Sequence, residues 1–251
     1  MTVPRSILIT GASSGIGEAL ALAYAAPEIF LRFSGRDPKR LEAVAQACRK
    51  RGAEVSAQTV DVADRDAMAA WIEAEDDACA LDLVIANAGV SAETSGNAGD
   101  SVRAVMAVNL AGVLNTVLPA LPRMQKRKAG KIALMSSLAA FRGLPSAPAY
   151  CASKAAVKSW GEALRGRVWR DGVRVSVVCP GFVKSRITDR NAFAMPFLMD
   201  ADKAARIIKA GIAKDKARIA FPLPLVLAVQ LLGALPPSWT DLLLRRMPMK
   251  E

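Results

Sequence analysis

Short apolar runs alternate with longer stretches of helical periodicity along most of this chain. The run from Ile7 to Ile9 is typical of a strand buried on both faces, and a helical pattern follows from Glu18 to Ala26. Similar strand-like runs recur at 29–34, 54–60, 81–86, 131–135, 173–178 and 219–221. Strands that alternate with helices predict an α/β fold built on a doubly wound parallel sheet.

Helical periodicity occupies the segments between these runs. Helices are expected at 40–50, 64–78, 101–110, 111–127 and 149–170. Asp37 and Pro38 fit the N-cap and the first position of the helix that ends near residue 50. Asn109 falls near the junction of the two central stretches, where Ala111-Gly112 permits a kink.

Length and composition favour one domain. The chain has 251 residues, of which 52% are apolar, so one α/β domain can bury a full core. Histidine is absent, which excludes histidine-based triads and histidine metal ligands, and no metal site is expected. An apolar run begins at Ile7, so no signal peptide is expected and the protein is predicted to be cytoplasmic. The scattered cysteines are interpreted as free thiols in a reducing compartment: Cys48, Cys79, Cys151 and Cys179.

A glycine-rich turn, Thr10 to Gly17, joins the first predicted strand to the first predicted helix. Its spacing is TGxxxGxG in place of the usual GxGxxG dinucleotide pattern. Glycines allow a tight turn and close approach to a ligand, while the helix N-terminus offers free N–H groups to a pyrophosphate. A plain turn is the alternative, but the strand-turn-helix context favours dinucleotide binding and a Rossmann-like fold. The candidate cofactor contacts here are Gly11, Ser13, Ser14, Gly15, Ile16 and Gly17.

The end of the second predicted strand bears on the choice of cofactor. In a dinucleotide fold, an acidic residue near this point binds the ribose 2′-hydroxyl of NAD, whereas an arginine accommodates the 2′-phosphate of NADP. Gly35 occupies the place of the acidic residue, and Arg36 follows it. This favours NADP, although the adjoining Asp37 leaves NAD open and Arg36 also fits plain surface charge.

Tyr150 and Lys154 share one face of a predicted helix, because residues i and i+4 lie one above the other. An amine held beside a phenol favours the phenolate, which would bring a pKa of roughly 10 towards neutral and suit a proton carrier. Ser137, at a predicted strand end, is a candidate to hold the same substrate oxygen. Taken alone, the pattern also fits an ordinary amphipathic helix turn.

Together these motifs resemble the short-chain dehydrogenase/reductase family over about residues 5–213. The resemblance depends on several motifs in the order and spacing of that family. They are the turn at 10–17, Asp61-Val62, Asn87-Ala88-Gly89, Asn109, Ser137, Tyr150-x-x-x-Lys154 and Pro180-Gly181. One departure is Ser185, which stands where the family often has threonine and keeps the hydroxyl.

The resemblance implies a role for each matching residue. Tyr150 would act as general acid/base, Lys154 would lower its pKa and hold the nicotinamide ribose, and Ser137 would orient the substrate oxygen. Asn109 would support a water relay to the lysine. The implied cofactor contacts beyond the turn are Asp61 and Val62 at the adenine, Asn87, Ala88 and Gly89 along the cofactor, and Pro180, Gly181 and Val183 at the nicotinamide. The implied reaction is reversible hydride transfer between NADP(H) and a carbonyl or alcohol.

The predicted catalytic domain spans residues 1–221 and includes a substrate loop at 182–199. Apolar side chains dominate this loop, with Phe193 and Phe197 as candidate substrate contacts. They favour a substrate with hydrophobic bulk, while a hydrophobic clasp on the core is an equal alternative.

Residues 222–251 are expected to form an apolar and basic helical extension of the same domain. Leu223 to Leu235 is apolar apart from Gln230, and Ser238 to Asp241 resembles a capping box that opens a second helix at 242–247. The apolar run is shorter than the about 20 residues of a membrane span. Packing on its own domain or on a partner subunit is favoured over contact with an anionic membrane surface through residues 222–250.

The net charge of +11 suits acidic cofactors, membrane surfaces or nucleic acid. No nucleic-acid motif or aromatic-interleaved basic stripe is present, so nucleic-acid binding is not expected. The expected partners are a small carbonyl or alcohol substrate and further copies of the chain in a homo-oligomer.

Two functions are consistent with these features. The first is an NADP-dependent oxidoreductase of a carbonyl or alcohol, and the second is an NADP(H)-binding sensor or scaffold without turnover. The intact Ser137, Tyr150 and Lys154 favour the first, because a sensor needs the phosphate-binding turn but not the phenol and ammonium pair.

Overall fold

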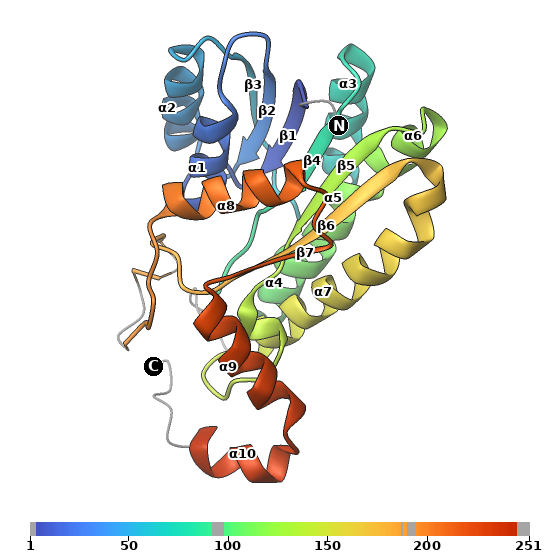
Figure 1. Cartoon of the computed structure of the whole chain (residues 1–251). Helices are drawn as coiled ribbons and strands as arrows, with labels where there is room; N and C mark the ends of the chain where they lie inside the picture. Colours follow the sequence, from blue (N-terminus) through green and yellow to red (C-terminus); the bar gives the residue numbers. More distant parts are fainter. Residues whose placement is uncertain (1–3, 92–97, 187, 190–193, 245–251) are drawn as a thin grey trace.

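A seven-stranded parallel sheet forms the centre of the computed structural model, with the strand order β3-β2-β1-β4-β5-β6-β7 (Figure 1). The structure describes residues 4–91, 98–186, 188–189 and 194–244. The strands are β1 Ser6–Thr10, β2 Phe30–Gly35, β3 Glu54–Thr59, β4 Leu83–Ala86, β5 Gly130–Met135, β6 Val173–Pro180 and β7 Arg218–Phe221. The predicted doubly wound parallel sheet in a single domain is confirmed.

Helices cover both faces of this sheet, so the molecule has three layers (Figure 1). The helices of the main body are α1 Gly15–Tyr24, α2 Pro38–Arg49, α3 Arg65–Ala78, α4 Ala98–Met106, α5 Gly112–Val117, α6 Ala120–Lys126, α7 Pro148–Val168 and α8 Ala201–Ala213. Side chains of α1, α2 and α8 share one core cluster, and those of α3, α5, α6 and α7 share the other. Ile7 and Ile9 point into the first cluster and Leu8 into the second, which explains why this strand is apolar at every position.

Two helices begin at an aspartate cap, of which the one at Asp37 was predicted. Asp37 caps α2 by accepting a hydrogen bond from the backbone N–H of Arg40, and Pro38 takes the first helical position. Asp64 caps α3 in the same way, accepting from two backbone N–H groups. These caps fix where the chain turns after β2 and β3, and so position the strand ends.

The central helical region differs from the expected kink. A π-helical turn, Ala107–Ala111, connects α4 to α5 and contains Asn109. Residues 99–126 are long and apolar enough to cross a membrane by length and composition alone. However, Val113, Val117 and Met124 are buried against the sheet, so this is a core helix of the domain.

The C-terminal extension consists of α9 Leu223–Ala234 and α10 Pro237–Leu244, which project beyond one end of the sheet (Figure 1). One face of α9 packs on its own domain, as expected, with Val226 buried against Leu138 and Val177. The opposite face carries an exposed leucine stripe, defined as Leu223, Leu227 and Leu231.

The predicted capping box in the extension is wrong. Pro237 begins α10, so Ser238 to Asp241 lie inside the helix. Proline is well suited to the first helical position because its missing N–H would be unpaired there in any case. Thr240 instead donates its hydroxyl to the Pro237 carbonyl oxygen and accepts a hydrogen bond from Arg142.

Candidate active site

The carboxyl ends of β1 and β4 lie side by side at the centre of the sheet, where the strand order changes direction. Ligands of open α/β sheets bind in the crevice at this point. The glycine-rich turn follows β1 and Asn87 follows β4. Ser137 follows β5, and Pro180 ends β6. The fold therefore brings the predicted motifs to one edge of the sheet.

Backbone geometry explains the glycines of the turn. Gly11 and Gly15 have φ angles of 68° and 59°, in the left-handed region that favours glycine. Gly17 needs no unusual φ, but a Cβ atom there would lie 2.2 Å from the Gly11 carbonyl oxygen. The turn is thus closed by backbone packing that a side chain would break.

Asn87 holds this turn in place. Its Nδ2 donates to the carbonyl oxygens of Thr10, at 2.9 Å, and Gly11, at 3.2 Å. The Thr10 hydroxyl oxygen accepts from the backbone N–H groups of Asn87 and Ala88 at 3.1 and 3.2 Å. Sequence reasoning expected Asn87 to line the cofactor; the structure shows its side chain binding the turn itself.

The N-terminus of α1 fits an anionic group. Within the described residues, Ser14 at its N-cap makes no side-chain hydrogen bond, whereas α2 and α3 are both capped by aspartate. An uncapped helix N-terminus leaves backbone N–H groups and the positive end of the helix dipole for a phosphate. Ile16 packs against the core and anchors the first turn of the helix. These residues therefore fit the pyrophosphate of a dinucleotide.

Several arginines surround the end of β2. Arg36 is exposed, which fits a cofactor contact and plain surface charge alike, and Arg40 pairs with Asp37 at 2.9 Å. The pKa of the Asp37 carboxyl is lowered, first by the hydrogen bond from the Arg40 N–H and also by the charges of Arg40 and Arg186. A Cβ at Gly35 would lie 3.0 Å from the Ser13 hydroxyl oxygen, so the strand end and the glycine-rich turn are in contact.

The Tyr150 phenol lies close to the Ser137 hydroxyl. Burial raises the pKa of the phenol, and the nearby Ser137 hydroxyl acts in the opposite direction. The hydroxyl of Ser137 also lies 3.5 Å from the Pro180 carbonyl oxygen and accepts from the Ala139 N–H at 3.1 Å. The structure therefore brings the two predicted groups together at the end of β5.

Lys154 lies beside this pair but is oriented by the sheet. Its Nζ donates to the Met135 carbonyl oxygen at 2.9 Å and lies 5.7 Å from the centroid of the Tyr150 ring. Burial lowers the pKa of Lys154 to about 8. Burial is the largest influence on the Tyr150 pKa in this structure, and the role of Lys154 in lowering that pKa stays a prediction.

Asn109 is fully buried in the π-helical turn. Its Oδ1 accepts from the Val90 N–H at 2.8 Å, and its Nδ2 donates to the Val90 carbonyl oxygen at 2.9 Å and to the Ser153 hydroxyl at 3.1 Å. A Cβ at Gly89 would lie 3.2 Å from Asn109 Oδ1 and 3.3 Å from Lys154 Nζ. Asn109 and Lys154 therefore both lie beside Gly89, and the π-helical turn directs the Asn109 amide to Val90 and Ser153. Such turns are common at functional sites.

The remaining cofactor candidates occupy the ends of β3 and β6. Asp61 accepts a hydrogen bond from the Ala63 N–H at 2.9 Å, and Val62 is buried against Gly112. Gly181 N–H donates to the Phe221 carbonyl oxygen at 2.8 Å, which ties the segment after β6 to β7. Val183 is buried and pairs with Met199 in an isolated bridge. Their contacts with the cofactor stay predictions.

The substrate loop closes on itself through the Val183–Met199 bridge. Met199 packs against the core, whereas Phe197 is 57% exposed and has a φ angle of 58°. Phe197 is therefore not a clasp on the core, and its contact with substrate stays a prediction. Phe193 lies outside the described residues.

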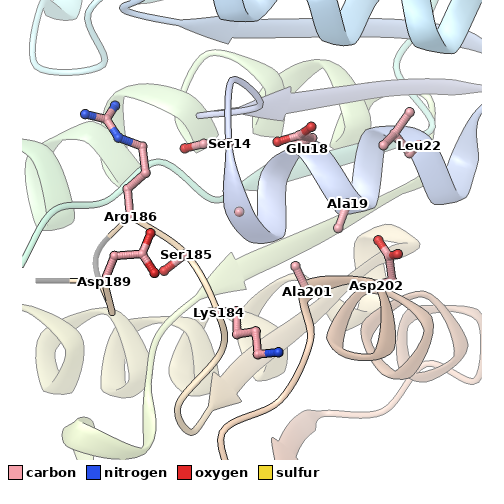
Figure 2. Close-up of a pocket in the computed structure, with 11 residues that line it drawn as sticks. Ser14, Glu18, Ala19, Leu22, Lys184, Ser185, Arg186, Asp189, Ala201 and Asp202 are labelled. Atoms are coloured by element: carbon pink, nitrogen blue, oxygen red, sulfur yellow. The ribbon is translucent and has the colours of Figure 1, made fainter. Parts of the chain in front are cut away.

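A cavity of about 390 Å³ lies between the N-terminal part of α1 and the loop that follows β6 (Figure 2). Ser14 and Gly15 line one side, and Ser185 and Arg186 line the other. Arg186 extends towards the side of Ser14, while Lys184 points away from it (Figure 2) and pairs with Asp200 at 2.8 Å. Sequence reasoning missed Arg186, although the two basic residues that flank Ser185 shortly after Pro180-Gly181 were a signal that could have found it.

Known proteins share both the sequence and the fold. A family model described as short chain dehydrogenase matches residues 5–194. An uncharacterized oxidoreductase of Myxococcus xanthus is 39% identical over 246 residues, covering 97% of each chain. A short-chain dehydrogenase from Sphingobium yanoikuyae in complex with NADPH has a TM-score of 0.81 at 23% identity and covers 98% of each chain. A short chain dehydrogenase from Mycobacterium paratuberculosis bound to NAD has a TM-score of 0.74 at 24% identity, covering 86% of this chain and 94% of that one.

The two solved structures establish the shared fold, and one was determined with NADPH and the other with NAD. The family model covers most of the chain, and the Myxococcus relative matches it almost from end to end. The motifs on which the resemblance depends all lie inside the matched region. The chain therefore belongs to the short-chain dehydrogenase family of oxidoreductases.

Proposed function

We propose that this protein transfers a hydride between NADP(H) and a carbonyl or alcohol substrate, with Tyr150 as the general acid/base. The observation that carries the proposal is that Tyr150, Ser137 and buried Lys154 lie beside one another at the end of the sheet where ligands bind. A binding protein without turnover needs the glycine-rich turn but does not need the Tyr150 phenol and the Ser137 hydroxyl close together.

The ionisation of these groups suits the reductive direction. Near neutral pH, the raised pKa keeps the Tyr150 phenol protonated, so its Oη can give a proton to a carbonyl oxygen that gains negative charge. The Ser137 hydroxyl can donate a second hydrogen bond to that oxygen, and the Lys154 ammonium stabilises its charge. The nicotinamide cofactor, when bound, supplies the hydride.

Lys154 and Asn109 position this machinery. The Ser136 hydroxyl donates to the Lys154 carbonyl oxygen at 2.7 Å, which ties α7 to the end of β5. Asn109 fixes Val90 and Ser153 on the other side. The ammonium and phenol are therefore held by rigid elements, as preorganised electrostatic catalysis requires.

The NADP preference is supported by the charge around β2. Arg36, Arg40 and Arg186 come from three different segments and lie about Asp37, where the adenosine ribose of a dinucleotide is expected. A 2′-phosphate would neutralise this positive charge, whereas the ribose hydroxyl of NAD would not. The proposed order of preference is NADP over NAD.

The decisive experiment is a panel of carbonyl and alcohol substrates, followed through NADPH absorbance. We expect turnover of apolar substrates, because Phe197 and Leu198 of the predicted substrate loop are exposed. Tight NADPH binding with no turnover across the panel would instead favour the sensor or scaffold alternative.

The leucine stripe supports a contact beyond the domain itself. Three leucines one turn apart on an uncharged helix form an apolar surface that water covers poorly, and we propose that a second copy of the chain covers it. Sedimentation with anionic vesicles at low and high salt, alongside measurement of the oligomeric state, tests this. Salt-sensitive binding of a monomer to vesicles would assign the stripe to a membrane surface instead.

A further inference from the structure

A second cavity, of about 600 Å³, lies between the segment after Ser137, the start of α7 and the C-terminal helix α10. Cys151, Ala152 and Ala155 of α7 line it. Each follows Tyr150 or Lys154 at a spacing that places it on another face of the helix. None of the predicted catalytic side chains, Asn109, Ser137, Tyr150 and Lys154, is among the described residues that line it.

The walls of this cavity are mostly apolar. They are formed by Ala139, Ala140, Phe141, Leu144, Pro145, Pro148, Ala152, Ala155 and Leu244. Its volume falls within the range of about 300 to 1,000 Å³ typical of small-molecule sites. The cavity can therefore enclose an apolar body of moderate size.

Arg142 supplies positive charge to these walls. Its side chain is 17% exposed, and its Nη2 donates to the Thr240 hydroxyl oxygen at 2.7 Å. The nearest carboxylate oxygen, of Asp241, is 3.6 Å away, and Nε is buried without a hydrogen-bond partner in the described part of the chain. A guanidinium has five donors, so this one is only partly satisfied.

Arg165 is an arginine of the same protein whose charge is paired with a carboxylate at short distance. Its side chain is 18% exposed, almost the same as that of Arg142. It pairs with Asp215 at 2.7 Å and also donates to the carbonyl oxygens of Val175 and Asp215 at 2.7 and 3.1 Å. The contrast indicates that the environment of Arg142 has room for a further anion.

We propose that the cavity binds an amphipathic carboxylate, with the carboxylate on Arg142 and the apolar body against the walls formed by α7 and Leu244. A carboxylate is the group that a guanidinium binds most specifically, through paired N–H donors. Asp241 competes for the same cation, so it weakens this binding. The site depends on α10, which lies beyond the residues matched by the family model.

The test uses the full-length protein without cofactor, so it does not depend on the proposed oxidoreductase activity. Binding of dodecanoate and of dodecanol, both below the concentrations at which they aggregate, is measured by calorimetry. We expect dodecanoate to bind at least tenfold more tightly, because only it carries the anion. Equal affinities would overturn the proposal and point to non-specific contact, such as with the leucine stripe.

Two substitutions at the site are expected to act in opposite directions. Arg142→Gln should weaken dodecanoate binding about tenfold or more, whereas Asp241→Asn should tighten it severalfold by removing the competing carboxylate. Arg165→Gln is the matched control: it removes an equally buried arginine and should leave dodecanoate affinity unchanged.

A variant that fills the cavity covers the case in which Arg142→Gln fails to fold. Ala155→Leu places a larger apolar side chain in the wall and should weaken the binding of dodecanoate and dodecanol alike. Unchanged dodecanoate affinity in both Asp241→Asn and Ala155→Leu would overturn the assignment of the cavity.

Discussion

Two glycines, one in the glycine-rich turn and one in the C-terminal extension, meet the same steric limit in different settings. A Cβ at Gly17 would lie 2.2 Å from the Gly11 carbonyl oxygen, and a Cβ at Gly233 would lie 2.4 Å from the carbonyl oxygen of Phe141. Gly17 closes a turn at the centre of the sheet, whereas Gly233 lies at the end of a helix whose outer face is exposed. The absence of a side chain therefore allows the glycine-rich turn to close at Gly17, and it allows α9 to pack on the Phe141 backbone at Gly233.

The difference comes from how each region is held. The turn is fixed by directional hydrogen bonds between Asn87 and Thr10. A small displacement of its backbone would therefore break these bonds. The extension is held mainly by apolar contacts of Val226 and its neighbours, together with the contacts of Arg142 to α10. Apolar contact is not directional, so it specifies the position of the extension less tightly than hydrogen bonds specify the turn.

The largest effect is expected from removing the Tyr150 hydroxyl while leaving the glycine-rich turn and the C-terminal extension intact. Tyr150→Phe should lower kcat by a factor on the order of 10² or more, because it deletes the proton transfer and keeps the packing. NADPH affinity, measured by fluorescence titration, should change little. Near wild-type turnover in this variant would remove Tyr150 from the proposed mechanism.

Alanine at each of the two glycines tests the comparison directly. Overpacking typically costs about 1 to 3 kcal/mol, and both Gly17→Ala and Gly233→Ala should lower the free energy of unfolding by that order. Only Gly17→Ala should also abolish NADPH binding, because it moves the backbone that meets the pyrophosphate. Urea denaturation of both variants measures the free energy of unfolding, and titration with NADPH measures cofactor binding.

Gly166 provides the control for these substitutions. A Cβ there would meet nothing within 4 Å, and the residue lies inside α7. Gly166→Ala should raise the free energy of unfolding by about 0.5 to 1 kcal/mol through helix propensity. Loss of NADPH binding in Gly233→Ala, but not in Gly166→Ala, would show that the extension and the turn are coupled.

Arginine substitutions test how the cofactor is chosen at the turn. Arg36→Ala should weaken NADPH binding by roughly 1 to 3 kcal/mol, the scale of a lost charge-assisted hydrogen bond, and leave NADH binding almost unchanged. Arg186→Ala should act in the same direction with a smaller effect, because that residue reaches the site from an exposed loop. Lys184→Ala is the control, since Lys184 pairs with Asp200 and points away from Ser14. Equal losses for NADPH and NADH would show that neither arginine reads the 2′-phosphate.

The last expected effect is a pH dependence of stability due to Lys154. Burial lowers its pKa to about 8 from the ordinary 10.5, so between these values the unfolded chain holds a proton that the folded protein has released. The contribution of Lys154 to the free energy of unfolding therefore rises with pH in this window, by at most about 1.4 kcal/mol per unit, and is constant below it.

Lys154→Met removes this titration. Without cofactor, the stability of the wild type relative to Lys154→Met should rise between pH 8 and pH 9.5, as measured by urea denaturation at each pH. Parallel curves for the two proteins would mean that the Lys154 pKa is not lowered by burial.

Much of the fold was predictable because its signals are local. Strands such as β1 showed continuous apolar runs, and Asp37 and Asp64 capped their helices as short-range chemistry requires. The prediction of a capping box at Ser238 was wrong because residues 238–241 also fit a helix interior, and the helix begins one residue earlier, at Pro237. The expected kink near Asn109 proved to be a π-helical turn, which depends on hydrogen bonds to Val90 and Ser153.

The sequence by itself determined the order of elements, the glycine-rich turn and the residues at the strand ends, because these follow from periodicity and backbone sterics within a few residues. Only the tertiary structure decided the ionisation of Tyr150 and Lys154, since burial depends on everything that packs around them. It also decided that Arg142 meets Thr240, 98 residues away, beside an apolar cavity. Such contacts join segments that are distant along the chain, so no local pattern encodes them.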